Sequence, residues 1–183
     1  MISDNYIEGT FVRIPIRETR KDKIVREASE AERFILALKF GTIEQKVFFK
    51  GASPEEVYDA LPDPKKHSAF TGSPATTSGR IGATFTAWDG YITGKNLELV
   101  RGKKIVQEWK TTEWPDGYPL SRLECTLTAK KGGTELKMVH SKVPAEQLTD
   151  YTSGWKSSYW DPLKEYLAER MASAPAKRER PRE

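Results

Sequence analysis

The chain has 183 residues, of which 37% are hydrophobic and 31% charged, so we expect one globular domain with a sizeable core. It contains no run of 18 apolar residues, which argues against a membrane-spanning helix. The net charge is +4, and residues 171–183 alone carry four basic and two acidic groups. The remainder is nearly neutral and has no basic stripe, which argues against a nucleic-acid partner.

Two further features indicate the compartment. Cys125 is the single cysteine, so the chain cannot build an internal disulfide framework and suits a reducing environment. The opening MISDNYIEGT is polar and acidic, without the basic and apolar parts of a secretory signal. We therefore expect a cytoplasmic protein.

Residues 1–40 are predicted to form an extension with an amphipathic helix between Glu18 and Leu38. Its apolar positions recur at helical spacing: Ile24, Ala28, Ala31, Ile35 and Leu38. This stripe is expected to pack on the body of the protein, with docking to another chain as the alternative. At the other end, residues 171–183 are basic and have nothing to bury, so we expect a disordered tail.

The body, residues 41–170, opens with a strand, because apolar and polar residues alternate through GTIEQKVFFKG. A short helix follows. Ser53 is expected to cap it, Pro54 to begin it and Glu56 to complete a capping box, with the end near Leu61. The segment KKHSAF predicts one further helical turn, which places His67 as a solvated polar residue.

A long antiparallel stretch comes next. Ile81, Ala83, Phe85 and Ala87 are predicted to share one strand face, and Asp89-Gly90 to form a turn. Residues 93–96 carry turn or bulge chemistry, and Lys131-Gly132-Gly133 predicts a hairpin turn. About six strands are expected after the opening one. The inward positions of the last two strands are predicted to be Leu123, Cys125, Leu127, Ala129, Leu136, Met138 and His140.

The C-terminal helix is predicted to start near Ala145. Tyr151, Trp155, Tyr159 and Leu163 follow one another at intervals of four, which gives one broad aromatic face. Pro162 cannot donate to the carbonyl of Ser158, so a kink is expected there. A kinked helix over a curved sheet predicts a cavity between them.

This order of elements predicts an α+β fold, in which a curved antiparallel sheet of about six to seven strands grips a long C-terminal helix. Two short helices follow the first strand. The segments KVFFKGASPEEVYDAL, AFTGSPA, WDGYITGKNLELVRGKKIVQEWKTTEWPDG, GGTEL and GWKSSYWDPLKEYL cover about residues 43–168. They resemble the helix-grip fold of the START and Bet v-like superfamily, and more specifically the C-terminal domain of the activators of heat-shock protein 90 ATPase.

That resemblance implies a heat-shock protein 90-type chaperone as partner, a role in the stress response, and no cofactor. The eukaryotic activators carry a separate, larger N-terminal domain, to which the resemblance credits much of the ATPase stimulation. Residues 1–40 are too short to be that domain. The resemblance therefore implies chaperone association more than full activation.

The candidate site residues fall into two groups. Those expected to line the cavity are Phe85, Trp109, Cys125, Met138, His140, Trp155 and Tyr159. For these, a purely structural role in the core competes with a role in a pocket for an apolar ligand. Those expected to contact a partner are Trp114 and Phe70. Trp114 has two interpretations, since it can fold back over the strands or be exposed.

Catalytic groups are scarce. The two histidines and one cysteine make no convincing zinc site, and no phosphate-binding loop or nucleophile elbow is present. His140 is better explained as an inward, hydrogen-bonded residue than as a catalytic base. We therefore expect a non-enzymatic co-chaperone-like binding module. The alternative is a carrier or sensor of a small apolar ligand, and an enzyme using the same cavity is a third, weaker hypothesis.

Overall fold

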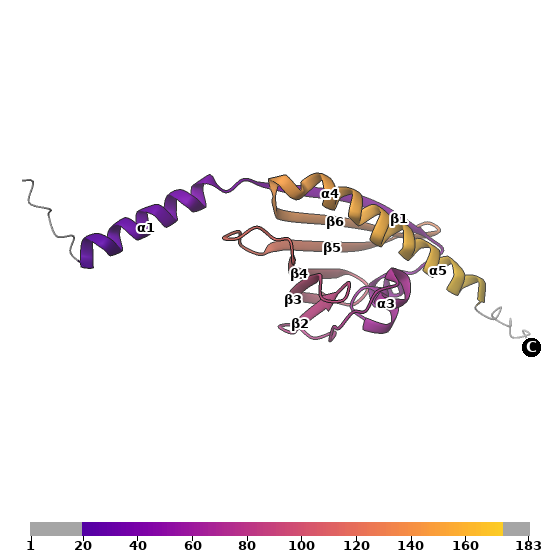
Figure 1. Cartoon of the computed structure of the whole chain (residues 1–183). Helices are drawn as coiled ribbons and strands as arrows, with labels where there is room; N and C mark the ends of the chain where they lie inside the picture. The colour runs from indigo at the N-terminus through magenta and orange to yellow at the C-terminus, as the bar shows by residue number, and fades with distance from the viewer. Residues whose placement is uncertain (1–19, 174–183) are drawn as a thin grey trace, which may run out of the picture. The chain divides into compact units, whose positions relative to one another are not determined.

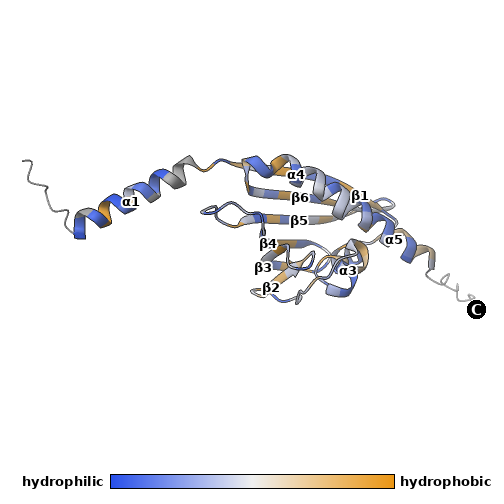
Figure 2. Cartoon of the chain, viewed as in Figure 1, coloured by the Kyte–Doolittle hydropathy of each residue, from blue (hydrophilic) through white to orange (hydrophobic). Residues whose placement is uncertain are grey.

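The computed structural model describes residues 20–173, and the expectation for the extended N-terminal start lies outside them. The disorder expected for residues 171–183 is wrong for residues 171–173, which are the last turn of a helix, and residues 174–183 lie outside the described range. The chain divides into two compact units, residues 1–37 and 38–183. In the first unit, α1 (Arg20–Ala37) occupies the predicted helical range and is mostly hydrophilic (Figure 2). Ile24 and Val25 are 58% and 61% exposed. The packing of this helix on the body stays a prediction.

The second unit is built on one six-stranded antiparallel sheet (Figure 1). Its order is β1-β6-β5-β4-β3-β2, so the first and second strands along the chain form the two edges. The strands are β1 (Phe40–Lys50), β2 (Thr84–Ala87), β3 (Ile92–Val100), β4 (Lys104–Thr111), β5 (Ser121–Lys130) and β6 (Gly133–Pro144). The predicted meander is confirmed, because the strands from β2 to β6 pair in chain order, but five strands follow β1 rather than about six.

Two short helices, α2 (Pro54–Ala60) and α3 (Pro64–Thr71), connect β1 to β2. The predicted capping box of α2 is present, since the Glu56 amide donates to Ser53 Oγ and the Ser53 amide donates to the Glu56 carboxylate. The second of these helices, α3, is longer than predicted. Asp63 caps α3 through the Lys66 amide, so the helix spans eight residues rather than one turn.

Local geometry also shortens the strand expected at 81–87. Ile81 is 65% exposed and lies before β2, so the prediction that it shares the inward face is wrong. Residues 93–96 are not a turn but part of β3, and a register shift, as in the predicted bulge, lies between Asn96 and Glu98. A Cβ at Gly94 would stand 2.5 Å from the Phe85 ring, so the glycine makes room for that ring.

The C-terminal helical segment runs along one face of the sheet (Figure 1). It consists of η1 (Ala145–Gln147), α4 (Leu148–Gly154), η2 (Trp155–Trp160) and α5 (Asp161–Ser173). η2 is a π-helical turn, in which the Asp161 amide donates to the Lys156 carbonyl. The backbone thus widens immediately before Pro162, and such a wider turn is a known way to relieve the helix around a residue that cannot donate.

The two faces of the sheet differ in chemistry. The inner face and the C-terminal helical segment bury a continuous core that includes Trp155, Tyr159, Trp160, Leu163 and Leu167. The outer face carries ion pairs between neighbouring strands. They join Lys104 to Glu98 and Glu124, Lys137 to Glu44 and Lys130 to Glu135, and a further pair within β5 joins Arg122 to Glu124. An antiparallel sheet with one buried and one solvated face follows from this alternation.

No helix within residues 20–173 combines the length and the apolar composition needed to cross a membrane.

Candidate functional site

The first candidate site is an interior cavity between α3, the inner face of the sheet and η2. Its volume is about 40 Å³. That is room for a few water molecules, whereas small-molecule pockets usually measure roughly 300–1,000 Å³. Five of the seven residues that the sequence assigns to a cavity line it: Phe85, Trp109, Cys125, Trp155 and Tyr159. The container predicted from the kinked helix is therefore almost filled by its own side chains.

His140 and Met138 are fully buried and line neither this cavity nor the groove described below. Both ring nitrogens of His140 are engaged. Trp155 Nε1–H donates to Nδ1 at 3.1 Å, so Nδ1 carries no proton and Nε2–H faces Ser121 Oγ at 2.7 Å. Ser121 Oγ in turn donates to the Trp109 carbonyl at 2.7 Å.

This chain of hydrogen bonds fixes His140 as a neutral imidazole. Burial lowers its pKa to about 3, because the charged form cannot be hydrated there. A histidine with no free nitrogen and so low a pKa is a structural link between β6, β5 and the C-terminal helical segment.

His67 contradicts its prediction as a solvated residue. It is 7% exposed and contacts the rings of Phe70 and Tyr159. Burial lowers its pKa to about 4, and its Nδ1 has no hydrogen-bond partner among the described residues. The cause is the longer α3, because a helix that begins at Pro64 turns His67 and Phe70 to the same inner side.

Phe70 is therefore not the exposed partner contact that the sequence predicts. It is 6% exposed and packs against Tyr159 and Tyr166. Trp114 takes the folded-back arrangement of its two interpretations. Its ring stacks on Tyr151 with 6.2 Å between ring centroids, and its Nε1–H donates to the Pro119 carbonyl at 3.1 Å.

The second candidate site is an open groove of about 320 Å³ between the C-terminal helical segment and the ends of β3 and β4. Three of the seven residues that the sequence assigns to a cavity, Trp109, Trp155 and Tyr159, also line this groove, but sequence reasoning missed its outer wall. Its lining residues are Trp88, Tyr91, Ile92, Trp109, Thr111, Glu113, Gln147, Asp150, Tyr151, Gly154, Trp155, Ser158 and Tyr159. The available signal was the pair of aromatic residues that flank the Asp89-Gly90 turn, which orients both rings toward the helix.

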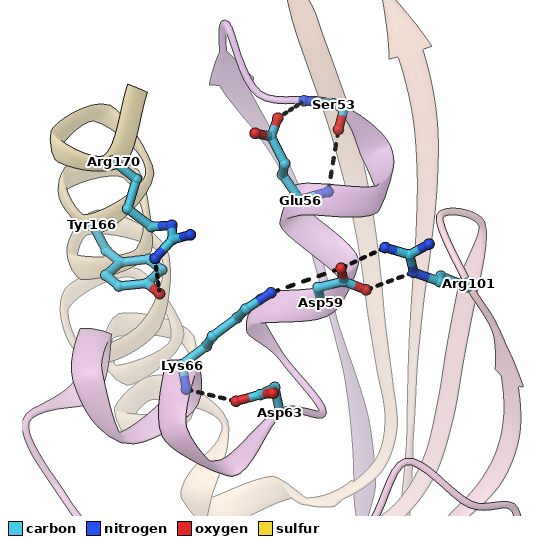
Figure 3. Close-up of polar contacts among 8 residues, drawn as sticks. All are labelled: Ser53, Glu56, Asp59, Asp63, Lys66, Arg101, Tyr166 and Arg170. Carbon is cyan, nitrogen blue, oxygen red and sulfur yellow. Dashed lines mark hydrogen bonds and ion pairs between the residues drawn. The ribbon is translucent and has the colours of Figure 1, made fainter. Parts of the chain in front are cut away.

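The third candidate site is a cluster of charged side chains around Asp59 on α2 (Figure 3). Arg101, in the turn between β3 and β4, donates to both carboxylate oxygens at 2.8 and 2.7 Å, and Lys66 lies 3.7 Å away. The Arg101 hydrogen bonds lower the pKa of Asp59. These contacts fasten α2 to the turn between β3 and β4 and tie α3 to α2.

Within residues 20–173, no group of three histidine, cysteine, aspartate or glutamate residues is placed to hold a metal ion. Cys125 is buried, which raises the pKa of its thiol to about 12. A thiol in that environment is a poor nucleophile.

The sheet, the long helical segment over its inner face and the filled interior define a helix-grip protein with an open side groove. The chain belongs to the Activator of Hsp90 ATPase homolog 1-like family, whose model matches residues 51–168.

Similar proteins include the human "Activator of 90 kDa heat shock protein ATPase homolog 1", which is 34% identical over 113 residues. The match covers 62% of this chain and 33% of the human protein, so the chain spans about a third of that relative's length. Among solved structures, an HSP90 activator from Plasmodium falciparum has a TM-score of 0.59 at 21% identity, covering 71% of this chain and 96% of that one.

DynU16, described as a putative protein in the dynemicin biosynthetic locus, has a TM-score of 0.59 at 19% identity, covering 69% of this chain and 47% of that one. At these identities the two structures share the fold with this chain, and the family is shown by the sequence match.

Proposed function

We propose that this protein is a non-enzymatic co-chaperone module that binds a heat-shock protein 90-type chaperone in the cytoplasm. The family match over residues 51–168 carries the proposal. The described residues add support, because the two histidines and the cysteine are buried and arranged for packing rather than for proton transfer.

The surface we propose for the partner lies at the end of the sheet that contains the Trp-Pro-Asp-Gly turn. Phe40 is 41% exposed and contacts Tyr118 at 5.3 Å between ring centroids, and Leu120 is 38% exposed. Trp114 lies half-buried in the same loop. We name Phe40, Trp114, Tyr118 and Leu120 the turn surface. Exposed aromatic residues of this kind often dominate protein interfaces.

In the test, the purified chain is titrated into the heat-shock protein 90 of the same organism. Calorimetry measures the association, and a separate assay measures ATP turnover. Binding in the micromolar range or tighter is expected. Phe40→Ser should weaken it about tenfold, a typical effect for an interface residue. Phe48→Ser is the matched control, since Phe48 lies on the same strand, 45% exposed, but far along it from the turn surface.

Equal weakening by both substitutions would show that the turn surface is not the contact, and absence of binding would contradict the co-chaperone proposal. ATP turnover distinguishes association from activation. Association is the outcome that we propose, and any stimulation of ATP turnover is a separate result.

A second candidate function is the binding of a small ligand, and the open groove favours it. Its volume of about 320 Å³ falls within the usual range for small-molecule sites, whereas the interior cavity does not. The ligand would then sit beside the C-terminal helical segment rather than beneath it.

A further inference from the structure

The open groove has an aromatic lining with a defined polar edge. Six of its thirteen lining residues are aromatic: Trp88, Tyr91, Trp109, Tyr151, Trp155 and Tyr159. They come from the turn between β2 and β3, from β4 and from α4 and η2. Rings from both the sheet and the helical segment therefore surround one space that is open to solvent.

Hydrogen bonds hold the walls of this groove in place. Tyr151 Oη lies 2.7 Å from Thr111 Oγ1, which joins α4 to the end of β4. Tyr91 Oη–H donates to the Glu113 carboxylate at 2.7 Å, and the Gln147 side-chain amide donates to the Glu113 carbonyl at 2.7 Å. Burial and the bond to Glu113 raise the pKa of Tyr91 to about 12, so it stays a donor at neutral pH. The site is thus preformed.

Backbone strain is concentrated at one edge of the groove. Trp88 and Asp89 have φ values of 55° and 53°, in the left-handed region that bulky residues rarely adopt. Such a conformation is energetically unfavourable and persists where the surroundings enforce it. Here the strained turn places the Trp88 ring near Tyr159, at 6.3 Å between centroids, on the wall of the groove.

The charge of the groove is negative. Glu113 and Asp150 are among the lining residues, which include no lysine, arginine or histidine, although the whole chain carries a net charge of +4. Among the described residues neither carboxylate forms an ion pair. The Gln147 side-chain oxygen is buried there without a hydrogen-bond partner. The groove therefore offers acceptors and negative charge without a cation to satisfy them.

We propose that the open groove binds a small organic cation, in which a protonated or quaternary ammonium group is attached to a flat apolar body. Aromatic rings attract such groups through the negative charge of their faces, and the carboxylates add direct attraction. The flat body would lie among the rings, with the ammonium group directed to Glu113 and Asp150. This inference extends the small-ligand alternative and does not depend on chaperone binding.

The experiment compares three probes of similar size: benzyltrimethylammonium, 2-phenylethanol and phenylacetate. Each is titrated into the full chain, with affinity measured by calorimetry and the position followed through the tryptophan indole resonances. We expect the cation to bind at least tenfold more tightly than the alcohol, the carboxylate to bind most weakly, and the signals of Trp88 and Trp155 to shift together.

Variants locate the charge effect. Glu113→Gln combined with Asp150→Asn should weaken the cation at least tenfold and leave the alcohol unchanged, because the amide at 113 can still accept from Tyr91. Glu165→Gln is the control, since Glu165 is an exposed carboxylate on α5 outside the groove. Thermal melts check that every variant is folded.

The proposal is overturned if the three probes bind equally, if the carboxylate binds best, or if none binds. It is equally overturned if Glu165→Gln weakens the cation as much as the groove variant does. None of these results changes the outcome of the chaperone titration, so the two proposals fail separately.

Discussion

The interior cavity and the open groove share three aromatic walls, Trp109, Trp155 and Tyr159, but differ in what closes them. On the α3 side, His67 and Trp160 complete the lining and leave about 40 Å³. On the side of the Trp-Pro-Asp-Gly turn, residues such as Glu113 and Tyr151 complete the lining and leave about 320 Å³. The same rings can therefore serve the core on one side and a binding surface on the other, according to the neighbouring loop.

The largest loss of stability is expected for a substitution of Trp160, which lines the interior cavity and not the groove. It is 2% exposed, stacks on Trp155 at 5.3 Å, and donates to the Gln45 side chain at 2.6 Å. Trp160→Ala should lower the free energy of unfolding by about 3–5 kcal/mol. Urea titrations measure this, with Trp160→Phe as a milder control. A loss under about 1 kcal/mol would mean that the α3 side is not the tightly packed one.

The second-largest expected effect is a loss of stability in acid, caused by the buried residues His67 and His140. The folded-state pKa values of His67 and His140 lie at about 4 and about 3, below the unfolded value of 6.5. The unfolded chain therefore binds protons first as pH falls through 6.5. Each histidine should reduce the stability by about 1.4 kcal/mol per pH unit from there down to its folded pKa.

Urea titrations between pH 7.5 and 5 test this slope, and His67→Leu should remove about half of it. A stability that stays level over this range would show that the two imidazoles are already accessible to protons in the folded protein.

Trp114→Ala tests the boundary of the groove. The indole is half-buried and stacks on the wall residue Tyr151, so its loss should cost about 1–2 kcal/mol, within the usual range for single substitutions. Thermal melts give the value, and a cost as large as that of Trp160→Ala would place Trp114 in the core.

Tyr91→Phe should have the smallest effect. It removes the hydrogen bond to Glu113 at the solvent-exposed edge, worth about 0.5–1 kcal/mol. The fluorescence of the groove tryptophans reports the local change at the groove edge, and urea titrations give the loss of stability. A loss above about 2 kcal/mol would show that the groove edge, like the closed side, is part of the folding core.

Local patterns predicted the elements well because their determinants are local. The Ser53 and Glu56 capping box, the hairpin at 131–133 and the four-residue spacing through Tyr151, Trp155 and Tyr159 all act over a few residues. The same patterns failed at α3, where Asp63 and Pro64 set an earlier start and turned His67 and Phe70 inward. One shifted boundary of this kind rotates every side chain of a short helix.

The sequence by itself therefore determined the antiparallel sheet, the long C-terminal helical segment and the aromatic identity of the residues between them. Only the tertiary structure decided which rings are core and which line a groove. The physical reason is that a cavity is a difference between volumes contributed by distant segments. A periodic pattern shows that Trp155 faces the sheet, but not that α3 fills one side of it and that Glu113, Asp150 and Tyr91 meet on the other.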